Sequence, residues 1–195
     1  MSVTASRAQH VITVLSLGLA AFLLLSQLTL FWQFHTHLPF KDTWHFLPLV
    51  KQVLEHGWLS TDMSAWLEPH ALAHRVGLSR TLMTLDYQWL NGQNHLLYAS
   101  AWLSTGCLLV IFTKAFWAIN HAHSQRVFQL SLAVIFLLAP GQFFNFLNPI
   151  NASWFTAMAF SAGALYLAQR GGVRAITSAC LLGCLAAFSN FSGAL

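Results

Sequence analysis

The chain has 195 residues, of which 56% are hydrophobic and only 7% are charged, and its formal net charge is +4. So few charged side chains cannot cover a water-soluble globule of this length, which excludes an ordinary soluble domain and indicates a polytopic membrane protein. Basic loops on one side of a membrane account for the positive charge, and nucleic acid is not predicted as a partner.

Uncharged stretches long enough to cross about 30 Å of hydrocarbon as helices recur along the chain. The first covers 11–32, follows Arg7 and lacks a small-residue cleavage site, so we expect a retained signal anchor. The second covers 96–113 and is closed by Lys114, whose side chain can extend to the interface. Both stretches are predicted to be transmembrane helices.

Three further apolar segments are predicted in the second half of the chain. No Asp, Glu, Lys or Arg occurs between 127 and 169, and Pro140-Gly141 divides this region into two passes. Residues 127–139 alone would rise only about 20 Å as a helix, so this span either begins near His121 or is not a full crossing. The run 175–195 is the last. Because it reaches the final residue, we expect 1–195 to be a single membrane domain truncated at its C-terminus.

The segment GQFFNFLNPINASW after the break is aromatic, uncharged and interrupted by Gly141 and Pro149. Irregular backbone at membrane depth is tolerated only where protein or a water-filled cavity satisfies its polar groups. We therefore expect Asn145, Asn148 and Asn151 to face the protein interior or the outer interface. An ordinary outer turn is the alternative.

The distribution of charge predicts the topology, because basic loops of membrane proteins lie in the cytoplasm. If the first helix runs outward, the cytoplasmic side receives Arg7, Lys114, Arg126, Arg170 and Arg174. The N-terminus is then cytoplasmic, and the loop 33–95 is extracytoplasmic. That loop contains all five acidic residues of the chain, Asp42, Glu55, Asp62, Glu68 and Asp86. Any chemistry is thus predicted outside the cytoplasm.

Two amphipathic helices are predicted in this loop. Apolar residues at spacings of three and four cover 43–56, and Gly57 follows where a helix would stop. A second helix fits 70–90, closed by Asn91-Gly92, with one apolar side formed by Leu72, Val76, Leu78, Leu82, Leu85 and Trp89. We expect both helices to lie along the outer membrane surface. The predicted fold is an all-α polytopic transmembrane helix bundle with a long extracytoplasmic loop that carries them.

Histidine and arginine residues of the second predicted helix are candidate ligand groups. His70 and His74 are four residues apart, a spacing that lets two imidazoles of a helix bind one metal ion. Interfacial or hydrogen-bonding histidines beside Arg75 are the alternative. Arg75 and Arg80 suit bidentate contact with a phosphate, such as that of a membrane lipid. Ion pairs of these arginines with Asp86 or Glu68 are the competing interpretation.

Several short motifs resemble one family of membrane enzymes. The pattern D-x-W-x-x-L-P-L is formed by Asp42, Trp44, Leu47, Pro48 and Leu49, and it is followed by Trp66, His70, His74 and Arg75 and by FNFLNPINASWF. With one span before them and a helical bundle after them, these motifs resemble the amino-terminal part of C-type glycosyltransferases. More narrowly, they resemble uncharacterised bacterial polytopic proteins of that kind. The resemblance implies a bacterial inner-membrane protein.

The resemblance also implies a reaction in which a sugar leaves a polyprenyl phosphate for an acceptor hydroxyl. Asp42 would be the general base. Positive charge for the leaving phosphate would come from Arg75, Arg80 and Lys41, or from a divalent metal ion held by Asp42 and His70. Trp44 and Trp66 would stack on the sugar ring. The implied partners are membrane lipid and a lipid-linked sugar donor.

Two other classes of protein remain open. A transporter component would carry ionisable residues at mid-bilayer depth, and the predicted spans have none. A non-catalytic membrane assembly or scaffold protein would need none of the loop chemistry. In that case Asp42 is a solvated residue beside Lys41, and Trp44 and Trp66 are interfacial anchors.

Overall fold

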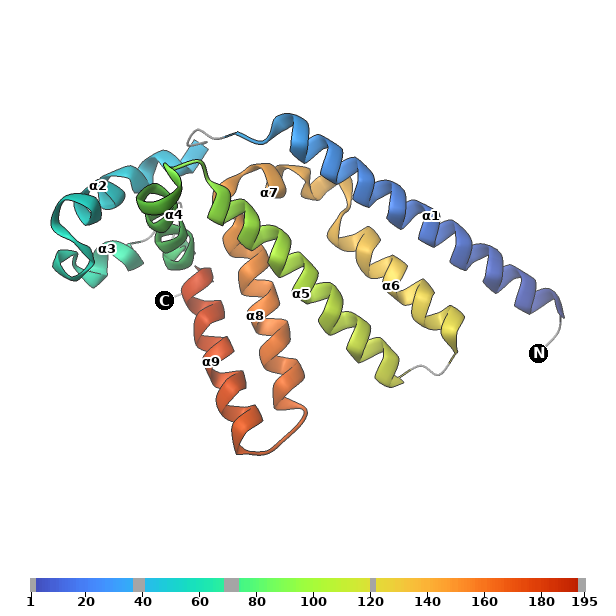
Figure 1. The fold of residues 1–195 in the computed structure, drawn as a ribbon. Coiled ribbons are helices and arrows are strands. Elements are labelled where there is room, and N and C mark those ends of the chain that lie inside the picture. The colour runs from blue at the N-terminus through green and yellow to red at the C-terminus, as the bar shows by residue number, and fades with distance from the viewer. Residues whose placement is uncertain (1–2, 37–40, 69–73, 120–121, 193–195) are drawn as a thin grey trace. The chain divides into compact units, whose positions relative to one another are not determined.

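The protein is almost entirely helical in a computed structural model (Figure 1). The structure describes residues 3–36, 41–68, 74–119 and 122–192, and their side chains except those of 3–6, 41–42, 74–75 and 191–192. The chain divides into two compact units. We call them the anchor unit, Met1–His35 with Gly106–Phe144, and the loop unit, Thr36–Thr105 with Asn145–Leu195.

The anchor unit pairs two apolar helices along their length. Helix α1 (Val3–Phe34) packs against α6 (His123–Leu137), and the end of α5 (His95–Ile119) belongs to the same unit (Figure 1). Near the start of α1, Gln9 Nε2 donates a hydrogen bond to Ser124 Oγ of α6 at 3.2 Å. Many large apolar side chains of α1 are exposed, Leu15 and Phe22 among them, as expected for a helix surrounded by lipid.

The break after α6 is stabilised by a side chain of α1. Pro140 begins a short 3₁₀ turn, η3 (Pro140–Gln142), which leads into α7 (Phe143–Leu147) with a bend of 42°. The last carbonyl groups before the break have no partner within their own helix. Gln27, only 3% exposed, donates from Nε2 to the carbonyl oxygens of Leu138 and Ala139, 3.2 Å away in each case. The predicted break at Pro140-Gly141 is therefore confirmed.

Within the described residues, two helices are long and apolar enough to cross a membrane, Arg7–Phe34 and His95–Ile119, and the bent pair from α6 to α7 makes a third if it counts as one span. The first two contain the predicted spans 11–32 and 96–113. Helix α6 has 15 residues and rises about 22 Å, so by itself it is not a full crossing. How many helices cross, and in which direction, stay predictions.

The loop unit contains most of the short elements. In chain order they are η1 (Lys41–Phe46), α2 (Leu47–His56), η2 (Trp58–Ser60), α3 (Met63–Leu67), β1 (His74–Arg75), α4 (Gly77–Leu90), the first turns of α5, η4 (Pro149–Asn151), α8 (Ala152–Ala168), α9 (Val173–Ser189) and β2 (Phe191–Ser192). Helices α8 and α9 form a hairpin (Figure 1) whose turn contains Gly171 and Gly172, at φ of 67° and 81°. Strands β1 and β2 are an antiparallel pair of two residues each.

Three predicted helix bounds are wrong. The first loop helix begins at Leu47, because 41–46 form a 3₁₀ turn that leads up to Pro48 in its first turn. The second begins at Gly77 and not at residue 70, because His74 and Arg75 pair with β2. The last helix ends at Ser189, before the end of the apolar run. The predicted ends at Gly57 and at Asn91, which is left-handed with φ of 61°, are confirmed.

Protein groups bind several polar atoms of the asparagine-rich segment after the break, although the buried Asn148 Oδ1 has no partner within the described part of the chain. Tyr98 of α5 places its hydroxyl 3.2 Å from the carbonyl oxygen of Leu147, and Ser79 of α4 donates to that of Ile150 at 3.3 Å. Asn151 Nδ2 donates to Asn145 Oδ1 at 2.9 Å, and Asn148 is buried. The interior location is confirmed for Asn148.

Replacing Gln27 with Leu tests the role of this side chain at the break. The variant removes the side-chain donor to the carbonyl groups of Leu138 and Ala139, of which Ala139 keeps the backbone N–H of Gln142, and we expect it to lower the free energy of unfolding by about 1 kcal/mol. Thermal unfolding in detergent measures the effect. Leu25→Ala, at an exposed position of the same helix, is the control. A Gln27→Leu protein as stable as the wild type would contradict this role.

Candidate functional site

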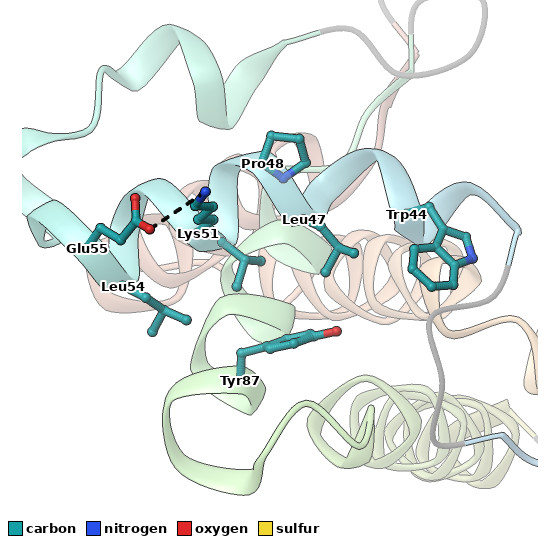
Figure 2. A pocket seen from close by; sticks show the side chains of 8 residues that line it. Trp44, Leu47, Pro48, Lys51, Leu54, Glu55 and Tyr87 are labelled. Carbon is teal, nitrogen blue, oxygen red and sulfur yellow. Dashed lines mark ion pairs between the residues drawn. The ribbon is translucent and has the colours of Figure 1, made fainter.

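A cavity of about 630 Å³ lies between α2 and α4 in the loop unit (Figure 2). Its lining is mostly apolar and comes from one continuous segment and one distant residue. The lining residues are Trp44, Leu47, Pro48, Val50, Lys51, Leu54, Glu55 and Tyr87. A cavity of this size with a few polar groups among apolar walls is typical of small-molecule sites.

Helical spacing explains how α2 forms one wall of this cavity. Leu47, Lys51 and Leu54 are separated by four and three residues, so they share a face of α2. A different face carries Leu49 and Val53, which are buried against Trp66 of α3. Helix α2 is thus fixed to the protein by one side, while another side is turned to the cavity.

The polar groups of the cavity are a tyrosine and an ion pair. Figure 2 shows the Tyr87 ring of α4 extending toward Leu47 of α2. Burial and, to a lesser degree, the charge of Asp86 raise the pKa of the Tyr87 hydroxyl, so it is neutral at physiological pH. Lys51 Nζ lies 3.8 Å from Glu55 Oε1, and both side chains are more than half exposed. Such a pair adds little stability and is available to a ligand.

The two tryptophans predicted to stack on a sugar have different environments. Trp44 lines the cavity and is 55% exposed. Trp66 is 7% exposed, and its ring stacks on that of Trp58 with centroids 5.2 Å apart and planes 5° apart. Trp58 in turn donates from Nε1 to Gln88 Oε1 at 3.2 Å. Trp44 is therefore accessible to a ligand, whereas Trp66 belongs to the core.

Arg80 is likewise held in the interior. It is 5% exposed, its guanidinium donates to the carbonyl oxygen of Ala65, and it lies 5.1 Å from the centre of the Phe46 ring. Burial lowers the pKa of Arg80, and the charge of Glu68 partly offsets that effect. Glu68, one of the two acidic residues predicted as partners of Arg80, thus acts on it electrostatically. These contacts bind α4 to α3 and η1.

Asp86 has a different partner. It is fully buried, and its Oδ2 accepts a hydrogen bond from the backbone N–H of Leu96 at 2.7 Å. The carboxylate thereby satisfies one of the open N–H groups in the first turn of α5. It holds the end of α4 against the start of α5.

Several predicted site residues lie outside the described side chains. Lys41 and Asp42 begin η1, and His74 and Arg75 form β1, but their side chains are outside the described part, as is all of His70. The roles of Asp42 as base and of Lys41 and Arg75 at a phosphate stay predictions. Because His74 lies in a strand, helical spacing no longer supports its pairing with His70. Among the described residues, no three His, Cys, Asp or Glu side chains lie close enough together to hold a metal ion.

The sequence interpretation missed Lys51, Glu55 and Tyr87 as lining residues. For the first two, a pattern was present, because Lys51 lies four residues after Leu47 and Glu55 four residues after Lys51. No local pattern indicates Tyr87, which reaches the cavity from another helix. Its position depends on how α4 packs against α2.

The described part of the chain is almost entirely helical, with two or three apolar helices suited to a membrane, and short helices of the loop unit form a cavity. Comparisons with protein-family models, with curated proteins and with solved structures found no match. The residues of the site are therefore the basis for inferring the function.

Alanine variants of Trp66 and Trp44 test which of the two side chains contributes to the stability of the core. Trp66→Ala removes a buried ring stacked on Trp58, so we expect it to lower the free energy of unfolding by about 3 to 5 kcal/mol. Trp44→Ala removes a half-exposed ring and is expected to change stability far less. Chemical unfolding followed by circular dichroism compares the two variants. Equal loss of stability would contradict the assignment.

Proposed function

We propose that the protein is an integral membrane glycosyltransferase that uses a polyprenyl-phosphate sugar, and that the α2–α4 cavity holds the lipid end of this donor. The observation that supports it best is the coincidence of motif and cavity. Trp44, Leu47 and Pro48 of the D-x-W-x-x-L-P-L motif all line the cavity. Asp42, the candidate base, lies two residues before Trp44 in the same 3₁₀ turn.

The chemistry of the lining fits such a donor. Leu47, Pro48 and Leu54 offer an apolar surface to isoprenoid units. Lys51 at the same wall carries a positive charge that suits a phosphate. A phosphate that approached Lys51 would compete with Glu55, which is free to turn toward water because it is more than half exposed. The ring of Trp44 is available to stack on a sugar.

The proposed reaction is a displacement at the anomeric carbon. The acceptor hydroxyl oxygen forms a new bond to this carbon while the bond from the carbon to the phosphate oxygen breaks. Asp42 accepts the hydroxyl proton, and the polyprenyl phosphate leaves with the electron pair of the broken bond. Positive charge from Lys41 and Arg75 would stabilise the leaving phosphate, and a divalent ion held by Asp42 and His70 would supply charge of the same sign. Arg80 is left out of this step because its guanidinium is bound in the core.

A second candidate is a non-catalytic membrane assembly protein. Trp66 and Arg80 were predicted to contact the donor, but they hold the loop helices together instead. This observation favours an assembly protein. In that case the cavity binds a lipid without chemistry. The transporter alternative has no supporting observation in the site.

Asp42→Asn tests the catalytic proposal. Loss of the proton acceptor is expected to reduce transfer by about 10²- to 10⁴-fold without lowering the amount of protein in the membrane. The assay follows a radiolabelled hexose from a synthetic polyprenyl phosphate to acceptors in membranes of the expressing cell. Asp62→Asn is the matched control, because Asp62 is an exposed carboxylate of the same loop whose N-cap role asparagine can fill. Transfer retained by Asp42→Asn would refute the assignment.

Binding is tested separately from turnover. Native mass spectrometry of the protein in nanodiscs should detect the polyprenyl-phosphate hexose as a mass shift. Trp44→Ala is expected to weaken this binding about tenfold, since a ring that contacts the donor is lost. Trp89→Ala, an exposed tryptophan that does not line the cavity, is the control. Equal binding by the wild type and Trp44→Ala would remove the cavity from the proposal, and binding without transfer would favour the assembly protein.

A further inference from the structure

Helix α4 has the reverse of the pattern expected of a helix on the surface of a water-soluble protein. Its buried residues are Gly77, Ser79, Arg80, Met83, Thr84 and Asp86, so polar and charged side chains lie inside. None of the four apolar residues Leu78, Leu82, Leu85 and Trp89 is fully buried, and Trp89 is 66% exposed. We call these four residues the outer stripe of α4.

The outer stripe is a single narrow face. Its members are separated by four, three and four residues, so at 3.6 residues per turn they fall within about 60° of one another around the helix axis. The buried residues lie on the opposite side of α4 by the same spacing. The three leucines are half-buried and Trp89 is exposed, so one whole face of the helix leaves apolar surface uncovered.

The buried polar side of α4 makes several hydrogen bonds, although Arg80 Nε and Asp86 Oδ1 are buried without one among the described residues. Ser79 donates to the carbonyl oxygen of Ile150, and Thr84 donates to that of Arg80 at 2.9 Å. Arg80 donates to Ala65, and Asp86 accepts from Leu96. The bond of Thr84 lies within α4, but those of Ser79, Arg80 and Asp86 join it to other elements and so hold this side of the helix inward. The apolar side chains of the outer stripe therefore stay partly uncovered, and contact with an apolar medium is more favourable for them than contact with water.

The attachment of α4 to α5 indicates which medium this is. The carbonyl oxygen of Asp86 accepts from the backbone N–H of Gly92 at 3.1 Å, and its carboxylate binds Leu96 in the first turn of α5. Gly92 has φ of 70°, and a Cβ there would lie 2.7 Å from the Tyr87 ring, so the turn is tight. Figure 1 shows the end of α4 joined to the start of α5 by a short loop. Since α5 is a candidate membrane span, Trp89 lies close to the point where the chain enters the bilayer.

We infer that the outer stripe of α4 lies against the lipid of the membrane that α5 crosses. Trp89 is at the level of the headgroups, where tryptophan is favoured, and the three leucines contact acyl chains. The side of α4 that carries Arg80 and Asp86 faces the protein. This inference does not rest on the proposed enzyme activity, because it uses only the burial pattern of α4 and its attachment to α5.

Site-directed spin labelling tests the inference in the full chain. Single cysteines replace Leu82, Leu85 or Gln52 in a background in which Cys107, Cys180 and Cys184 are serine. Each protein is labelled with a nitroxide in nanodiscs. Relaxation by oxygen, which concentrates in lipid, is compared with relaxation by a water-soluble nickel chelate. We expect a several-fold higher ratio of oxygen to nickel accessibility at 82 and 85 than at 52, an exposed polar position of α2.

Equal nickel accessibility at 82, 85 and 52 would show that the outer stripe faces water and would overturn the inference. Labels at 82 and 85 that neither reagent reaches would also overturn it, because a second copy or another protein would then cover the stripe. Should the labelled variants fail to fold, the unmodified protein provides the test. A lipid-soluble carbene probe in the bilayer should then label the peptide 77–90 on Leu78, Leu82, Leu85 or Trp89. Absence of label from these residues, with α1 labelled in the same sample, would contradict the inference.

Discussion

The loop unit depends on the buried carboxylate of Asp86. Its Oδ2 holds the first turn of α5 through Leu96, while its carbonyl oxygen closes the end of α4 through Gly92. A negative charge near the N-terminus of α5 is favoured by the helix dipole, which helps offset the cost of burying it. The cavity residue Tyr87 and the exposed Trp89 lie on α4 within three residues of this point. The bond thus sets the position of one cavity wall and of the outer stripe together.

Much of the helical architecture could be predicted from local composition. The long apolar runs that became α1 and α5, the break at Pro140-Gly141 and the helix ends at Gly57 and Asn91 all depend on residues close in sequence. The start of α4 could not be predicted in this way, since His74 and Arg75 pair with Phe191 and Ser192 more than a hundred residues later. The apolar periodicity predicted a continuous helix there, whereas the long-range pairing of β1 with β2 holds His74 and Arg75 in a strand.

The site shows the same division between local and long-range information. The face of α2 that lines the cavity follows from the spacing of Leu47, Lys51 and Leu54, whereas Tyr87 enters it only through the packing of α4. Trp44 and Trp66 are both tryptophans of one loop, and their sequence contexts do not tell which is buried. Packing against Leu49 and Val53, together with stacking on Trp58, buries Trp66. The motif resemblance therefore predicted several site residues. Their burial shows that Trp44 is accessible at the cavity, whereas Trp66 and Arg80 belong to the core.

Photo-crosslinking with a polyprenyl-phosphate hexose that carries a diazirine in its first isoprene unit tests whether the α2–α4 cavity holds the lipid end of the donor. We predict that irradiation in nanodiscs joins the probe to the segment that contains Trp44, Leu47 and Leu54, or to Tyr87 across the cavity, and that excess unlabelled donor prevents it. Crosslinks confined to other helices, or labelling that the unlabelled donor does not reduce, would contradict the assignment of this cavity to a lipid-linked sugar.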